Sequence, residues 1–90
     1  MGIRERLRNH DERYATPAET EARTMSDVGE LLRRRRKELR WTQEEVAGFL
    51  GRSARLVSDM EHGRGSVGFE KVLEYANGLG IDLVLRVRGK

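Results

Sequence analysis

Hydrophobic residues recur at helical spacing in two short segments between positions 42 and 63, in the stretch TQEEVAGFLGRSARLVSDMEHG. A glycine, Gly51, separates the segments and can adopt the positive φ of a sharp turn. This spacing predicts two short helices joined by a tight turn. The apolar positions are Val46, Ala47 and Leu50 in the first helix, and Val57 and Met60 in the second.

The ends of both helices carry capping signals. Thr42 and Glu45 have the spacing of a capping box, in which each side chain accepts a hydrogen bond from the other residue's backbone N–H. Ser53 can cap the second helix, and Gly63 can close it. Two capped helices with a glycine between them are typical of a helix-turn-helix. Helices this short are unstable alone in water, so the flanking segments must pack against them.

A longer helix is expected before this pair, over residues 27–39, starting from a capping box of Asp27 and Glu30. Arg35 is the polar exception on its apolar face. Another helix is expected from Ser66 or Gly68 to about Leu79. The residues expected to point inward from this last helix, with Tyr75 at its edge, are Phe69, Val72, Leu73, Ala76 and Leu79.

From residue 81 to 88 the hydrophobic period changes to two, which predicts a strand with one apolar face. A strand needs a backbone partner, and the simplest donor is a second copy of the chain paired about a two-fold axis. The segment 3–7 is a weaker internal candidate. The pattern therefore predicts a homodimer whose interface contains Ile81, Leu83, Leu85 and Val87.

The distribution of charge and the absence of cysteine indicate which kinds of partner are compatible with this chain. Residues 1–25 form a charged arm with no net charge, expected to be partly helical from Pro17 to about Thr24, and residues 26–90 carry the net +3. This excess favours a polyanionic partner, although an arginine-rich composition can also reflect the base composition of the genome. There is no cysteine, and His10 and His62 lack the spacing of metal ligands.

The motifs that the sequence lacks lead to expectations about catalysis and location. We expect no metal, no cofactor and no enzymatic activity, because no nucleophile–base pair or phosphate-binding loop is visible. No apolar run approaches the length of a membrane span, so we expect a cytoplasmic protein with no membrane partner.

Five consecutive cations occupy residues 33–37, and on a helix they spread around the cylinder. Most are expected to be solvated, and one or two can meet phosphates. Arg36 and Glu61 lie on helices whose inner faces should meet, and a half-buried charge needs a partner. We therefore expect them to pair across the domain; the alternative is two independent surface charges.

Residues 27–79 resemble the Xre/Cro/C1-type helix-turn-helix family in the TQEE motif at 42–45, the turn glycine, the serine cap and Glu61. A final helix followed directly by the segment 81–88 is most similar to HipB-type antitoxins. The resemblance implies a mainly α, four-to-five-helix, lambda-repressor-like domain whose C-terminal strand pairs across a homodimer. It also implies the Arg36–Glu61 pair. Arg40 departs from the family's usual glycine and must be left-handed unless the turn differs.

In that family the second helix of the motif enters the major groove. Arg55 is then the strongest candidate for base reading, because its guanidinium can bond both guanine O6 and N7; the alternatives are an exposed arginine or a pair with Asp59. Asp59 can instead accept from cytosine or orient Arg55. Gln43 can hold a phosphate at a helix N-terminus or merely support the cap. The full DNA-binding set is Gln43, Arg52, Ser53, Ala54, Arg55, Ser58 and Arg64, with Arg52 and Arg64 as backbone contacts.

The resemblance implies a transcriptional repressor that binds an inverted-repeat operator in double-stranded DNA as a dimer. It also implies an antitoxin role, in a type II toxin–antitoxin pair, with a HipA-like kinase toxin as partner. The alternatives are a stand-alone Xre-type regulator with no toxin partner, and a protein-interaction module that has lost DNA binding. The sequence leaves the operator and the role of the arm open.

Overall fold

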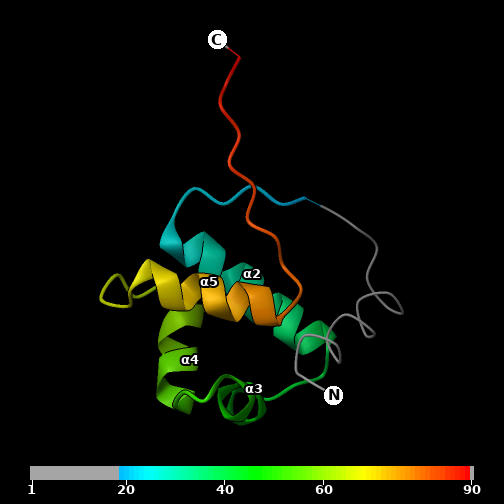
Figure 1. Cartoon of the computed structure of the whole chain (residues 1–90), viewed down its shortest axis with the longest axis vertical. Coiled ribbons are helices and arrows are strands. Elements are labelled where there is room, and N and C mark those ends of the chain that lie inside the picture. The colour runs from blue at the N-terminus through cyan, green and yellow to red at the C-terminus, as the bar shows by residue number, and fades with distance from the viewer. Residues whose placement is uncertain (1–18, 90) are drawn as a thin grey trace.

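The computed structural model describes residues 19–89, and within this range it contains four helices and no strand. The helices are α2 (Met25–Glu38), α3 (Gln43–Leu50), α4 (Ala54–Glu61) and α5 (Phe69–Gly78). α4 packs against both α2 and α3, and α5 packs against α3 (Figure 1). The mainly helical architecture predicted from the sequence is therefore confirmed.

The core is small and aliphatic, apart from two aromatic side chains. Its centre joins residues from all four helices, and Tyr75 and Val57 are both fully buried. The buried apolar residues are Leu32, Leu39, Trp41, Val46, Ala47, Val57, Met60, Val72, Tyr75, Ala76 and Leu79. α2 and α4 approach closely at Gly29, where a Cβ would lie 2.6 Å from the Met60 carbonyl oxygen.

The predicted capping of the helix-turn-helix is confirmed. The Thr42 side chain accepts from the Glu45 N–H, and the Glu45 carboxylate accepts from the Thr42 N–H, both at 3.0 Å. Gly51 ends α3 with φ 67°, and the Ser53 hydroxyl accepts from the Leu56 N–H at 3.1 Å. These caps fix where α3 stops and α4 begins, so the motif's two helices are set locally.

The start of the first described helix differs from the prediction. α2 begins at Met25 because Thr24 is its cap: the Thr24 hydroxyl accepts from the Asp27 N–H, and Asp27 bonds back to the Thr24 N–H. Asp27 thus completes the capping box instead of opening it. The helix expected from residue 17 to 24 is absent over its described part, residues 19–24. Its first residues, and the segment 3–7, lie outside the described residues.

The far end of α2 contains a left-handed arginine, as its departure from the family pattern requires. Arg40 has φ 60°, its N–H donates to the Lys37 carbonyl, and the Trp41 N–H donates to the Arg36 carbonyl. This is the hydrogen-bond pattern of a helix end that glycine usually occupies. The turn keeps its ordinary shape, and Arg40 carries the conformational strain.

The buried face of α5 also differs from the prediction. Tyr75, expected at the edge, is fully buried, whereas Phe69 and Leu73 are 49% and 39% exposed. Val72, Tyr75, Ala76 and Leu79 form one stripe at helical spacing, and this stripe faces the core. Tyr75 can replace an aliphatic residue there because its hydroxyl finds a buried acceptor, Glu61.

The strand predicted over residues 81–88 is not present in the single chain. After Gly80 the chain has no regular secondary structure up to residue 89, and it extends away from the helices (Figure 1). A strand exists only when a second strand supplies its hydrogen bonds, and none of the described residues does so. The alternating side chains are left in solvent, with Leu85 87% exposed and Val87 93% exposed.

Candidate nucleic-acid interface

The helix α4 is held by its apolar face and presents its opposite face to solvent. Val57 and Met60 are buried, and Ala54 packs partly against the core. Arg55 is exposed, and Ser58 is half-buried. Among residues 19–89 no hydrogen bond or ion pair restrains the Arg55 guanidinium, which leaves all its donors available. Such a cation at the start of an exposed helix face can bond a base edge or a phosphate.

The proposed partner of Arg55 on α4 is engaged elsewhere. Asp59 Oδ1 lies 2.9 Å from Arg64 Nε in an ion pair, so Asp59 bridges α4 to the loop that follows it. The Arg55–Asp59 pair considered from the sequence is absent. Arg64, considered as a phosphate contact, is therefore partly neutralised in the free chain.

Arg52, in the turn before α4, is also paired. Its Nη2 lies 3.1 Å from Glu74 Oε2 and its Nε lies 3.3 Å from Glu74 Oε1, so the turn is joined to α5. The hydrogen bond from Arg52 lowers the pKa of Glu74, and the bond to Glu74 raises the pKa of Arg52. Both side chains are more than one third exposed, so water screens the pair.

A buried polar cluster lies behind the exposed face and joins all four described helices at Glu61. Its carboxylate accepts from Arg36 Nε at 2.7 Å, from Arg36 Nη2 at 3.0 Å, from Gln43 Nε2 at 3.1 Å and from the Tyr75 hydroxyl. Arg36 Nη1 also donates to the Trp41 carbonyl at 2.7 Å. The structure thus contains the Arg36–Glu61 pair expected from the sequence, with side chains 9% and 1% exposed.

The hydrogen bonds of this cluster shift the pKa values of its ionisable members and fix the position of the Gln43 side chain. Burial by itself would raise the pKa of Glu61, but the hydrogen bonds from Arg36, Tyr75 and Gln43 outweigh it and lower that pKa. The bond to Glu61 raises the pKa of Arg36. Burial, followed by the bond to Glu61, raises the pKa of Tyr75. Because one amide hydrogen of Gln43 is held by Glu61, its side chain has a defined place at the start of α3.

The comparisons with known proteins agree with this geometry. A family model described as a helix-turn-helix domain matches residues 27–88, which cover the four described helices except the first two residues of α2, and most of the segment after them. The chain belongs to the helix-turn-helix family. It is also 34% identical over 68 residues to y4mF of Sinorhizobium fredii, named an uncharacterized HTH-type transcriptional regulator, covering 76% of this chain and 90% of the relative.

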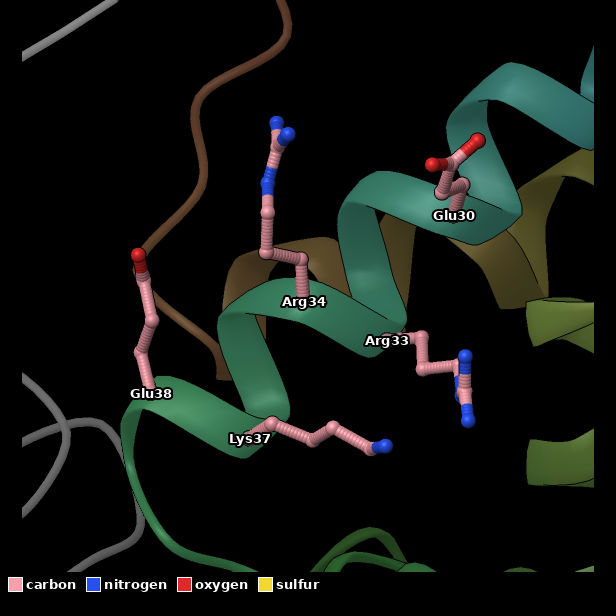
Figure 2. A pocket seen from close by; sticks show the side chains of 5 residues that line it. All are labelled: Glu30, Arg33, Arg34, Lys37 and Glu38. Carbon is pink, nitrogen blue, oxygen red and sulfur yellow. The ribbon is translucent and has the colours of Figure 1, made fainter.

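In this helix-turn-helix protein the cationic run at 33–37 does not form one patch. Arg35 is buried and donates from Nε to the Leu79 carbonyl at 3.0 Å, and Arg36 belongs to the buried cluster. The exposed members line a shallow depression on α2, and Figure 2 shows Arg34 pointing away from Arg33 and Lys37. The depression is lined by Glu30, Arg33, Arg34, Lys37 and Glu38. All five of these residues are charged, whereas small-molecule sites are lined mainly by hydrophobic and aromatic side chains.

Two residues of the candidate interface were not singled out for it from the sequence. His62 follows α4 and is exposed, with Nδ1 2.8 Å from the Ser58 carbonyl oxygen. Its spacing of four from Ser58 and seven from Arg55 is the signal that would have placed it on this helix face. Glu74 had no comparable signal, because its contact with Arg52 depends on how α5 packs.

Among residues 19–89 no group of three potential ligands could hold a metal ion. The same part of the chain contains no helix with the length and hydrophobicity required to cross a membrane.

Proposed function

We propose that this protein binds double-stranded DNA as a transcriptional repressor, with α4 in the major groove and Arg55 reading a base. The observation that supports it best is the exposed Arg55 guanidinium at the start of the capped helix α4, which no hydrogen bond or ion pair among residues 19–89 restrains. Family membership supports this placement, because the second helix of a helix-turn-helix typically enters the major groove. The remaining proposed contacts are Gln43, Arg52, Ser53, Ala54, Ser58 and Arg64.

The test compares Arg55→Ala with Arg34→Ala on DNA from upstream of the protein's own gene. Arg34 has the same charge and is exposed, but it lies on α2 and not on α4 (Figure 2). Loss of a bidentate base contact corresponds to about 1–3 kcal/mol, or roughly 5- to 150-fold in Kd, with relaxed preference at one base pair. Fluorescence anisotropy measures both. Equal, small losses in the two variants would mean that Arg55 acts only as a charge.

The repressor is proposed to act as a homodimer joined through residues 81–88. Leu83, Leu85 and Val87 share one side of an alternating segment and are 50%, 87% and 93% exposed. Ile81 marks the start of this segment and packs partly on the core. Phe69 and Leu73 add exposed apolar surface on α5. A second copy would supply both the strand partner and the cover for these side chains.

A two-fold dimer presents two copies of α4, which fits an inverted-repeat operator with half-sites about 34–36 Å apart. We further propose, on the resemblance of residues 81–88 to HipB-type antitoxins, that a HipA-like kinase toxin is the protein partner. A neighbouring gene for a kinase-like protein, and co-purification of the two expressed together, would support this role. Failure of that pair to associate would favour the stand-alone regulator.

A further inference from the structure

We propose that Glu74 competes with DNA phosphate for Arg52. Glu74 binds the Arg52 side chain in the free protein, and Arg52 moves to the DNA backbone in the complex. This inference rests on the proposed DNA-binding function and adds a residue of α5 that sets its affinity. Arg52 lies between Gly51, which ends α3, and Ser53, which caps α4. Its backbone N–H donates to the Ala47 carbonyl at 2.9 Å. This bond fixes the turn, and the Arg52 side chain can exchange partners without a change in the backbone.

In the proposed complex, Arg52 would lie close to the DNA phosphates. It precedes by three residues the side chain proposed to read a base, so it stands where the edge of a groove passes the start of α4. In the free chain the Arg52 guanidinium instead turns back to α5, where Glu74 bonds it through both carboxylate oxygens. Glu70 on the same helix adds a weaker attraction.

The exchange requires little energy on the protein side. The side chains of Arg52 and Glu74 are 38% and 40% exposed, and ion pairs of this kind are weak. A phosphate also offers two acceptor oxygens to the guanidinium, and its neutralisation releases counterions. Binding therefore favours transfer of Arg52 from carboxylate to phosphate.

Glu74 is a cleaner probe of this exchange than the other ion pair at the interface. The Asp59–Arg64 pair begins on α4 itself, so changing Asp59 would also alter the proposed base-reading surface. Glu74 belongs to α5, outside the helix-turn-helix, and it can be changed without touching α4.

The experiment is a double-mutant cycle of Glu74→Gln and Arg52→Ala, measured as Kd for the upstream DNA across a salt series. Glu74→Gln should tighten binding about two- to fivefold, the range equivalent to a weak ion pair. Arg52→Ala should weaken binding and reduce the slope of log K against log salt by about 0.9. In the Arg52→Ala background, Glu74→Gln should have no effect. Glu70→Gln is the matched charge control: Glu70 attracts Arg52 only weakly, whereas Glu74 bonds it, so Glu70→Gln should have the smaller effect.

The outcomes separate this inference from the proposed function. If Glu74→Gln tightened DNA binding equally with and without Arg52, the effect would be one of general charge, and the proposed exchange would be refuted. An unchanged salt slope in Arg52→Ala would overturn it too. Wild-type binding that Arg55→Ala weakens, combined with either result, would leave the proposed function standing. Absence of DNA binding by wild type would defeat both. Circular dichroism confirms that each variant is folded before the cycle is interpreted.

Discussion

Replacing Glu61 with glutamine removes one charge from the buried cluster while leaving its size almost unchanged. The Glu61 side chain is 1% exposed and accepts two hydrogen bonds from Arg36, one from Gln43 and one from Tyr75. A glutamine offers one acceptor oxygen and turns its amide donors toward other donors. Removing one partner of a buried ion pair typically costs about 3–5 kcal/mol. The free energy of unfolding of a small domain is about 5–15 kcal/mol, so the loss should be roughly a fifth of it or more.

Urea unfolding at pH 7, followed by circular dichroism and by the fluorescence of the buried Trp41, measures this loss. The matched control is Glu30→Gln, an exposed position on α2 with no ion pair among the described residues. It should change the free energy of unfolding by less than about 0.5 kcal/mol. A loss below about 1 kcal/mol for Glu61→Gln would refute the reasoning, because Arg36 would then tolerate burial without a counter-charge.

The same variant has a defined pH dependence. Burial acts to raise the pKa of Glu61, but the bonds from Arg36, Tyr75 and Gln43 hold it below its ordinary value. A carboxylate whose pKa is lower in the folded state stabilises the fold above its unfolded pKa, about 4.3, and this contribution disappears as the pH falls through the folded pKa. Wild type should therefore lose more stability than Glu61→Gln between about pH 5 and pH 3. Other carboxylates with lowered pKa values, such as Asp27, leave the variant some acid sensitivity.

Two further changes test single features. Arg40→Gly should raise the free energy of unfolding by up to about 1 kcal/mol, because glycine relieves the left-handed conformation at φ 60° while adding freedom to the unfolded chain; a lower urea midpoint would show that the arginine side chain contributes more than its strain. Truncation after Gly80 should shift the protein from dimer to monomer in light scattering while helical circular dichroism is retained, since Ile81 packs only partly on the core; a persistent dimer would place the interface elsewhere.

Some features of this protein follow from the sequence alone because they are local. The Thr42–Glu45 capping box and the glycine that ends α3 involve residues at most a few positions apart, so spacing is sufficient to predict them. The Arg36–Glu61 pair spans 25 residues, yet it was inferred because two apolar faces must meet and a charge between them needs a partner.

Other features were decided by the tertiary structure. The hydrophobic pattern of α5 allowed Phe69 and Leu73 to be buried, but the packing of α5 selected the neighbouring stripe, whose Tyr75 reaches Glu61. The Arg52–Glu74 pair likewise depends on how α5 is placed over the turn. Periodicity shows that residues share a helix face, whereas the face that becomes buried depends on the surfaces it meets. For residues 81–88 no partner strand is present among residues 19–89, so their alternating pattern forms no strand there.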